Sequence, residues 1–381
     1  MVVAVLALSV LAFFGGGGWY FAGQIRSDGL AVSAGTTEYP LVVVSVGPGS
    51  VVLRAAPGSA PEHRLRSSFV YGLGWAGGSG ILGPVRTRGA DGSVVRPLTL
   101  ETGTGPSAGT RAELRTEVYD DPATAYGVRF RQVSYPCANG RCPAWFVPGT
   151  ASTWAVMVHG KGATRTEPLR ALGAVLRVKM PALIIEYRND AGAPRDPSAF
   201  YRYGQTEWRD LDDAVAYALG HGAARVVLFG FSMGGGIVAS FLEHSARADR
   251  VPAVVLDAPM LDFRRTVGYA ASQRRLPLLG TPIPGPLTWS AETIAGWRFG
   301  IDWARIDYSA AAWLHVPALV FHGTADDTVP ISTSDALAAR YPTLVREVRL
   351  PGVGHVESWN AGPARYTATV SAFLAGYVND R

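Results

Sequence analysis

Short apolar runs without polar alternation recur from about Tyr126 to the C-terminus, and segments at helical spacing separate them. The runs comprise residues 154–158, 182–187, 225–229, 253–256 and 318–321. Strands that are buried on both faces of a parallel sheet have this character. The intervening segments, such as 207–220 and 234–243, show the apolar periodicity of helices. This alternation predicts an α/β fold with a doubly wound, mostly parallel sheet.

Polar residues of catalytic types follow the carboxyl ends of the predicted strands, where sites in doubly wound sheets collect. The strand ends lead into HGKG at 159–162, GFSMG at 230–234, HGTADDTVP at 322–330 and GVGH at 352–355. A G-x-S-x-G match alone is weak in a chain with 45 glycines, so its position between a strand and a helix matters more. Ser232, Asp326 and His355 follow in the chain order serine, aspartate, histidine.

From about Tyr126 to its end, the chain resembles an α/β-hydrolase near the esterase, monoacylglycerol-lipase and S33-like serine hydrolase branch. The resemblance rests on the ordered combination of HGxG, GxSMGG, HGxxDxxVP and GxGH, and it does not cover the preceding segment. It implies that Ser232, Asp326 and His355 form a catalytic triad that works through an acyl-enzyme intermediate.

Each triad residue has a physical role in these expected surroundings. Ser232 would lie on a strained turn between strand and helix, where Gly230 and Gly234 leave room for the close backbone. His355 would accept the serine proton during attack and return it to the leaving group. Asp326 would fix the imidazole tautomer and stabilise the cation that forms.

The oxyanion of the reaction is expected to meet two backbone N–H groups, those of Met233 and Lys161. Met233 begins the helix after the serine turn, and Lys161 lies in the loop after the first parallel strand. Backbone donors tolerate many side chains, so Lys161 is assigned by its position and not by its amine.

Other polar residues near these motifs have simpler interpretations. Asp327 competes with the preceding aspartate as the partner of the histidine, and the HGxxDxxVP pattern favours the first of the two. His159 and His322 each follow a buried strand and precede a glycine, which favours structural histidines that bond loop backbone. Glu207 and Asp210, near a helix start, are expected to favour the positive end of that helix.

An insertion at about residues 260–316 interrupts the predicted hydrolase segment. It holds several prolines and the tryptophans Trp289, Trp297, Trp303 and Trp313. An excursion at this place lies above the site of an α/β-hydrolase and usually acts as a lid. Helical pieces are expected around 263–274 and 291–299. An aromatic lid favours an apolar acyl or aryl substrate, and ordinary helical packing is the alternative.

The sequence therefore predicts a serine hydrolase that cleaves small-molecule carboxylic esters, with no cofactor and no metal. It contains no zinc-type cysteine set, P-loop or dinucleotide fingerprint. An S33-like serine peptidase or amidase acting on a peptide is one alternative. A non-catalytic α/β-hydrolase-like binding module, in which the preceding segment does the binding, is the other.

A small β-rich accessory segment is expected at residues 34–120, ahead of the hydrolase domain at 126–381. Short apolar runs there, at 41–46, 51–54 and 68–73, are closely punctuated by turn residues. Residues 101–109 are predicted to be a linker. The formal charge of +5 is scattered among acidic residues, so we expect no nucleic-acid partner.

The N-terminus is apolar from Val2 to Ala22, and the first charge is Arg26. Twenty-one helical residues span about 30 Å, the thickness of a bilayer core. This predicts a transmembrane anchor over residues 1–25. A cleavable signal peptide is the rival, because Val32-Ser33-Ala34 resembles a cleavage site, although it lies far beyond the apolar run.

The two cysteines, Cys137 and Cys142, flank an Asn-Gly pair that favours a two-residue hairpin turn. With Asn139-Gly140 in the turn, the cysteines would face each other as a close cross-strand pair. We therefore expect a disulfide and an oxidising, extracytoplasmic compartment for the catalytic domain.

Overall fold

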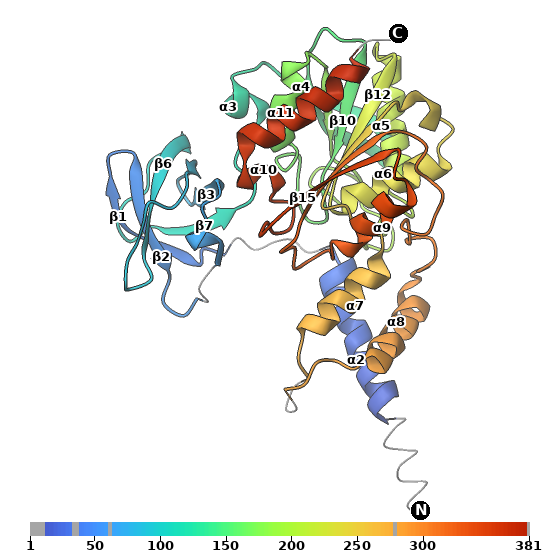
Figure 1. Cartoon of the computed structure of the whole chain (residues 1–381), viewed down its shortest axis with the longest axis horizontal. Helices are drawn as coiled ribbons and strands as arrows, with labels where there is room; N and C mark the ends of the chain where they lie inside the picture. The colour runs from blue at the N-terminus through green and yellow to red at the C-terminus, as the bar shows by residue number, and fades with distance from the viewer. Residues whose placement is uncertain (1–11, 33–37, 60–62, 277–279, 379–381) are drawn as a thin grey trace, which may run out of the picture.

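The computed structural model of the chain describes residues 12–32, 38–59, 63–276 and 280–378, and these form two β-sheets (Figure 1). Strands of residues 41–115 form the first sheet, and strands of residues 131–350 form the second. The second sheet is sandwiched between helices, and a pair of helices projects from it together with the N-terminal helix (Figure 1).

The first sheet is antiparallel and has the strand order β2-β1-β7-β3-β4-β6-β5, with a further pairing of β2 with β6. The strands are β1 (Leu41–Gly47), β2 (Ser50–Ala55), β3 (Tyr71–Trp75), β4 (Gly78–Leu82), β5 (Thr87–Arg88), β6 (Val94–Gly103) and β7 (Arg111–Arg115). Its own apolar cluster includes Leu53, Leu73 and Trp75.

The predicted linker at residues 101–109 is wrong. Residues 101–103 end β6, and the stretch that follows them returns to β7 in the same sheet. Turn-forming residues suggested a domain boundary, but the same residue types connect adjacent antiparallel strands. The sequence pattern does not distinguish these two uses.

The second sheet has eight strands in the order β15-β14-β13-β12-β10-β11-β9-β8. They are β8 (Arg131–Cys137), β9 (Gly140–Val147), β10 (Thr153–Val158), β11 (Ala182–Ile185), β12 (Arg225–Phe231), β13 (Val254–Asp257), β14 (Ala318–Gly323) and β15 (Val345–Leu350). Only the pairings of β8 with β9 and of β9 with β11 are antiparallel among the described strands of this sheet. The prediction of a mostly parallel α/β sheet is confirmed.

Helices cover both faces of this sheet (Figure 1). One face packs against α5 (Trp208–Gly220), α6 (Met233–His244) and α9 (Ser332–Arg340), and the other against α4 (Leu169–Arg177) and α11 (Pro363–Leu374). Successive residues of β10 serve the two faces, since Val156 joins one apolar cluster and Met157 the other. Both are fully buried, which explains the lack of polar alternation in the sequence.

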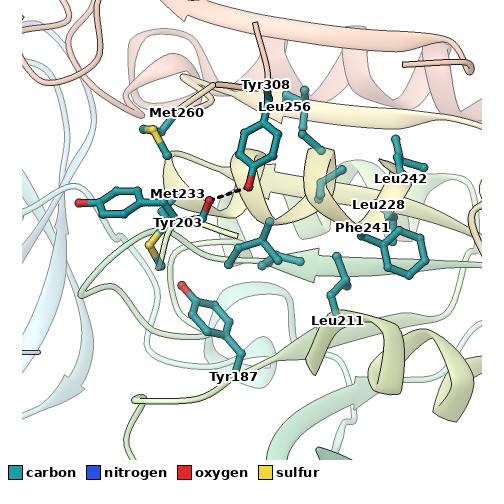
Figure 2. Close-up of a cluster of buried hydrophobic side chains, with 14 of the residues drawn as sticks. Tyr187, Tyr203, Leu211, Leu228, Met233, Phe241, Leu242, Leu256, Met260 and Tyr308 are labelled. Carbon is teal, nitrogen blue, oxygen red and sulfur yellow. Dashed lines mark hydrogen bonds between the residues drawn. The ribbon is translucent and has the colours of Figure 1, made fainter. Parts of the chain in front are cut away.

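The cluster beneath α6 is largely apolar and includes buried tyrosines (Figure 2). Leu228 and Leu256 from neighbouring strands pack there with Phe241 of α6. The hydroxyl of Tyr308 donates to the carbonyl of Tyr203 at 3.0 Å, so this polar group remains satisfied inside the core. The cluster supports α6 from below and thereby the turn that precedes it.

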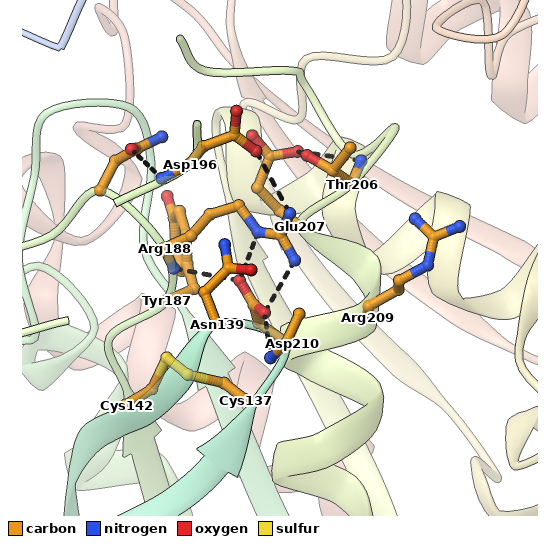
Figure 3. Close-up of polar contacts among 12 residues, drawn as sticks. Cys137, Asn139, Cys142, Tyr187, Arg188, Asp196, Thr206, Glu207, Arg209 and Asp210 are labelled. Carbon is orange, nitrogen blue, oxygen red and sulfur yellow. Dashed lines mark hydrogen bonds and ion pairs between the residues drawn. A yellow bond between two sulfur atoms is a disulfide. The ribbon is translucent and has the colours of Figure 1, made fainter. Parts of the chain in front are cut away.

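The two cysteines form the expected disulfide, with Cα atoms 5.8 Å apart (Figure 3). The predicted turn is wrong by one residue. Cys137 pairs with Gly140, and Tyr135 pairs with Cys142, so Ala138 and Asn139 occupy the turn. The cysteines are therefore diagonal neighbours instead of a directly opposed pair, and the sulfurs still reach each other.

Behind this hairpin, Arg188 links the loop after β11 to α5 (Figure 3). Its guanidinium binds both carboxylate oxygens of Asp210, at 2.7 and 2.9 Å. Glu207 is fully buried and accepts backbone N–H groups of Arg202 and Gly204 at 2.6 and 3.0 Å. Both acidic residues lie at the helix start, as expected. In addition, both bind the loop that precedes α5.

The predicted anchor at residues 1–25 lies partly outside the described residues, which begin at residue 12. From there the chain forms π-helical turns at Ala12–Gly16 and Ile25–Leu30 with α2 (Gly17–Gln24) between them. Among the described residues, none of the helices is both long and apolar enough to cross a membrane. Instead, α2 packs along α8 (Gly285–Phe299) of the 260–316 insertion, whose other helix is α7 (Phe263–Gln273).

Candidate active site

Ser232 lies at the junction of β12 and α6 with a left-handed backbone, at φ 48° and ψ −117°. This conformation is costly for a residue other than glycine. Surrounding bonds hold it: the Ser232 N–H donates to the Asp257 carbonyl at 3.0 Å, and the Ser232 carbonyl accepts from Met260 and Gly235, both at 2.9 Å. The turn places the serine side chain at the carboxyl edge of the sheet.

The glycines on either side of this turn are required by close backbone contacts. A Cβ atom on Gly230 would lie 2.7 Å from the Gly234 carbonyl oxygen, and one on Gly234 would lie 2.3 Å from the Val158 carbonyl oxygen. Both distances are shorter than any normal contact, so α6 can start directly against β10 only with glycine at these positions.

Ser232, His355 and Asp326 lie in one hydrogen-bonded chain. The Ser232 Oγ is 2.8 Å from His355 Nε2, and His355 Nδ1 is 2.7 Å from Asp326 Oδ2. These three residues are separated by long stretches of sequence and come from the ends of β12 and β14 and the loop after β15. The hydroxyl can donate to Nε2 while Nδ1–H donates to the carboxylate, which requires a neutral imidazole.

Asp326 is buried, and both of its carboxylate oxygens are hydrogen-bonded. Its Oδ1 accepts the backbone N–H groups of Thr328 and Val329 at 2.9 and 2.8 Å, and its Oδ2 also lies 3.2 Å from His322 Nε2. Burial by itself would raise the pKa of Asp326, but the hydrogen bonds from His322 and His355 lower it far below its usual range. The carboxylate is therefore charged at neutral pH.

Asp327 does not occupy an equivalent position. Its carboxylate is bonded to the Thr328 hydroxyl at 3.2 Å, and its backbone carbonyl accepts from Gln273 of α7 at 2.9 Å. His355 contacts the neighbouring Asp326 and not Asp327, as the HGxxDxxVP pattern indicates.

The pKa of His355 responds to this environment. Burial alone would lower it, but the hydrogen bond to Asp326 and the charge of that carboxylate raise it above its usual value. The imidazole is therefore a stronger base than free histidine and forms a stabilised cation when it takes a proton.

The loop after β10 brings a backbone donor toward Ser232. A Cβ atom on Gly160 would lie only 3.0 Å from the Ser232 Cβ, so the loop passes directly over the serine. The N–H groups of Lys161 and Met233 donate to no group among the described residues. Both residues line the same cavity as Ser232, so both amides are available to a ligand there. The Lys161 ammonium points elsewhere and donates to the Asp28 carbonyl at 2.7 Å.

Glu167 supports this loop, and the sequence interpretation missed it. Its buried carboxylate accepts the Gly160 N–H at 2.7 Å and lies 3.8 Å from the Arg170 guanidinium. Burial raises the pKa of Glu167, and the charge of Arg170 opposes that shift. A carboxylate in the helix-forming segment after HGKG carries no distinctive sequence signal, because acidic residues are common in such segments.

A cavity of about 440 Å³ opens above Ser232 and His355. Its walls are mostly apolar and come from α7, α8, the loops just before these two helices and the N-terminal helical segment. They include Phe21, Ile25, Met260, Phe263, Val267, Ala271, Ile283 and Ala291. The 260–316 insertion thus covers the site, as a lid would. The contribution of residues 21–29 was not predicted, because the same apolar run reads as a membrane anchor.

His159 and His322 are fully buried, and their ring nitrogens bond groups other than Ser232. His322 bonds the Val329 carbonyl at 3.1 Å and the Ser334 hydroxyl at 2.7 Å, which is the structural role expected for it. His159 lies between Glu186 and Asp190, with Nε2 at 3.1 and 3.0 Å from their oxygens.

His159, Glu186 and Asp190 also form a set whose ligand atoms lie close enough to hold a metal ion. Each already has protein partners, because Arg165 binds Glu186 at 3.0 Å and the Tyr187 N–H binds Asp190 at 2.7 Å. Burial opposes protonation of His159, yet the two carboxylates raise its pKa well above its usual value. A protonated imidazole and the Arg165 guanidinium together balance the two carboxylates, so a structural role accounts for the cluster.

The accessory sheet contacts the loop that carries His355. Tyr71 of β3 donates from its hydroxyl to Glu357 at 3.1 Å, and Arg64 forms an ion pair with the same carboxylate at 2.6 Å. Val70 and Asn360 exchange two hydrogen bonds, of 3.0 and 2.7 Å. Sequence reasoning gave this segment a role only in the binding-module alternative, and the contacts give it a direct connection to the site.

Comparison with known proteins is informative for the fold. No protein-family model matches the chain. Uncharacterized proteins from two strains of Mycobacterium tuberculosis, CDC 1551 / Oshkosh and ATCC 25618 / H37Rv, are each 29% identical over 226 residues. The match covers 56% of this chain and 68% of theirs.

The structure is similar to that of the Pyrococcus furiosus esterase Pf2001. In space group P21 that esterase aligns with a TM-score of 0.53 and 16% identity, covering 68% of this chain and 97% of its own. In space group C2221 the TM-score is 0.52 at 15% identity, covering 68% and 95%. At this identity the likeness concerns architecture, which agrees with the strand order and the serine turn. The chain has the α/β-hydrolase fold.

Proposed function

We propose that the protein is a serine hydrolase that cleaves carboxylic esters through an acyl-enzyme intermediate. The observation that carries this proposal is the hydrogen-bonded chain from Ser232 Oγ through His355 to Asp326, at 2.8 and 2.7 Å. It lies at the floor of a mostly apolar cavity, on a strained turn that aims the hydroxyl at the cavity.

Acylation follows from the positions of these groups. Ser232 Oγ attacks the ester carbonyl carbon while its proton moves to His355 Nε2, and the carbonyl oxygen becomes an oxyanion. The Met233 and Lys161 N–H groups would donate to that oxygen. When the intermediate collapses, the carbon–oxygen bond to the alcohol breaks, and the alcohol leaves with the proton held by His355.

Deacylation repeats these steps with water. His355 takes a proton from water, whose oxygen attacks the acyl carbon, and the proton then returns to Ser232 Oγ as the acid leaves. Asp326 stays ionised throughout, because its lowered pKa disfavours protonation, and its charge stabilises the imidazolium in both halves of the reaction.

The cavity favours esters with an apolar acyl group over peptides. Phe21, Phe263 and Ile283 are among the side chains that surround the space above the serine. Burial of apolar area contributes about 25 cal/mol per Å², so an acyl chain gains affinity from such walls. The esterase activity of the Pyrococcus furiosus neighbour is consistent with this substrate class.

A fluorophosphonate probe tests the proposal, because it reacts with activated serine nucleophiles. The wild-type protein should be labelled, and Ser232→Ala should not. The control is Ser240→Ala, which changes a buried serine of the following helix α6 and should still be labelled. Failure of a folded wild type to react would contradict the proposal. A panel of acyl esters and aminoacyl amides would then distinguish esterase from amidase activity.

We also propose that the catalytic domain lies outside the cytoplasm, on the strength of the Cys137–Cys142 disulfide. Thiol alkylation of protein taken from the native host should modify neither cysteine before reduction and both after it. Free thiols in the protein from its native compartment would contradict this location.

A further inference from the structure

Among the described residues, eight large hydrophobic side chains are exposed. Five of them lie on two adjacent helical segments. These are Phe13, Trp19 and Tyr20 at the N-terminus and Trp289 and Trp297 of α8; we call this set the aromatic surface. The other three, Val44, Val46 and Leu100, are aliphatic and lie on the accessory sheet. The aromatic surface is therefore specific to the projecting helices (Figure 1).

On α8 the exposed aromatic residues follow the helical repeat. Trp289, Thr293 and Trp297 are spaced by four residues and form one exposed stripe, which contains no charge. Trp289 is 64% and Trp297 78% exposed, whereas Leu287 and Ala291 on the other side are buried. The helix α8 therefore has two apolar faces. Packing inside the protein explains the buried face with Leu287 and Ala291, but it does not explain the exposed stripe of tryptophans.

The N-terminal segment extends this stripe across a close helix contact. The Ser290 hydroxyl donates to the Phe14 carbonyl at 2.8 Å, and Arg298 donates to the Trp19 carbonyl at 3.3 Å. The guanidinium of Arg298 also lies 3.6 Å over the Trp19 ring. The sequence from residue 12 to residue 25 carries no charge, so the N-terminal segment adds uncharged exposed residues beside the α8 stripe, with the Arg298 cation at the contact of the two helices.

We propose that the aromatic surface docks onto the surface of a phospholipid bilayer and that the enzyme draws its acyl ester substrate from that bilayer. The second part rests on the proposed function. Tryptophan and tyrosine favour the membrane interface, and uncharged apolar helix faces lie in its plane. Residues 1–11, which directly precede this segment, contain one polar residue, Ser9, and no charge. Arg298, at the contact of the two helices, supplies a cation for lipid phosphates.

The same helices form the wall of the cavity, which connects docking to catalysis. Phe21 and Ile25 of the N-terminal segment and Thr288 and Ala291 of α8 line the cavity. One layer of helices, about 10 Å thick, therefore separates the aromatic surface from the space above Ser232. An acyl chain that leaves the bilayer has to pass only this layer to reach the serine.

Tryptophan fluorescence tests the docking without any need for activity. Full-chain protein is mixed with vesicles of phosphatidylcholine and phosphatidylglycerol whose acyl chains carry bromine, a contact quencher. We expect quenching in the wild type and loss of most of it in Trp289→Phe/Trp297→Phe. Trp208→Phe, on α5 away from the aromatic surface, should keep it. Equal quenching in both variants would overturn the proposal. So would a dimer that forms through these two tryptophans, since a second copy of the chain would then cover the surface.

An activity comparison tests the connection to substrate. Trp289→Glu/Trp297→Glu should hydrolyse a soluble short-chain ester within about twofold of wild type but lose about tenfold or more on a long-chain ester presented in vesicles. Val46→Glu/Leu100→Glu changes exposed apolar residues of the accessory sheet and should affect neither rate. An equal loss on both esters, or no loss on either, would overturn the proposal. If the wild type is quenched by the vesicles but hydrolyses neither ester, the docking is supported and only the proposed function is contradicted.

Discussion

At the scale of single residues, the site combines strain with complete hydrogen bonding. Ser232 has a left-handed backbone, as does Val356 beside the histidine, at φ 52°. Such conformations persist only where neighbouring contacts hold them. Here the Val356 carbonyl accepts from the buried Arg170 at 2.7 Å, and Asp326 uses both of its oxygens. The three reacting groups are therefore held in place before any substrate binds.

Replacing the carboxylate of Asp326 should impair catalysis far more than replacing that of its neighbour. We expect Asp326→Asn to lower kcat by about 10⁴-fold, because the amide cannot hold the required imidazole tautomer or stabilise its cation. Asp327→Asn, the matched control, should stay within about threefold. Steady-state kinetics on a short-chain ester measures both, and a larger loss in Asp327→Asn would reverse the assignment.

The pH dependence of kcat/KM should report the raised pKa of His355. Only the neutral imidazole accepts the serine proton, so activity falls as pH drops through that pKa. Because the pKa is raised, the acid midpoint should lie above 6.5, the usual histidine value. In Asp326→Asn the residual activity should have a lower midpoint, since the charge that raises the pKa is gone. A wild-type midpoint below 6.5 would show that burial dominates.

At the scale of elements, the glycine run at residues 15–18 acquires a reason. A Cβ atom on Gly18 would lie 2.4 Å from the Ser290 Oγ and 3.0 Å from the Ile294 Cδ1, and one on Gly17 would lie 3.1 Å from the Leu287 Cδ1. Glycine therefore allows α2 to approach α8 closely. In an isolated sequence the same glycines only interrupt an apolar run, and their packing role depends on the partner helix.

Gly18→Val should disturb this helix pair and the cavity wall. We expect a loss of about 1–3 kcal/mol in stability from overpacking, together with a higher KM for long-chain esters. Gly23→Ala, also on α2, is the matched control, because its new methyl group would meet no atom within 4 Å. Thermal denaturation and KM measurements report both effects. Equal behaviour of the two variants would mean that α2 does not pack on α8 as closely as the structure shows.

At the scale of the whole molecule, the accessory sheet contributes to the site through the loop after β15. That loop carries His355, and Glu357 two residues later is bound by Tyr71 and Arg64 of the accessory part. The Tyr71 side chain is buried at this contact. Burial raises the pKa of Tyr71, and the charge of Glu357 adds to that shift, so the tyrosine stays a neutral donor. The accessory sheet therefore constrains the position of the histidine from outside the hydrolase fold.

Tyr71→Phe should reveal this constraint in the kinetics. We expect kcat on a soluble ester to fall by about three- to tenfold with KM within about twofold, because the histidine is displaced while the cavity is unchanged. Tyr39→Phe removes a hydroxyl that bonds no described residue and serves as the control. A change in KM alone, or equal kcat values in the two variants, would contradict a positioning role for the accessory sheet.

The sequence predicted local features better than long-range ones. The bounds of β10 and of the insertion helix α7 were predicted within one residue, since burial on both faces marks the strand and amphipathic spacing marks the helix. The hairpin register was wrong by one residue, and the supposed linker is part of a sheet. Both errors concern pairing, which depends on which strands meet and is not encoded in the residues of one strand.

The sequence alone determined the class of fold and the candidate triad, because parallel strands bring their carboxyl ends to one edge and the motifs lie at those ends. Only the tertiary structure joined the accessory sheet to the His355 loop and placed the N-terminal segment against the 260–316 insertion. These outcomes depend on distances between residues that are far apart in the chain. An apolar run can equally pack on lipid or on protein, because the hydrophobic effect is not directional and the available partner surface selects the contact.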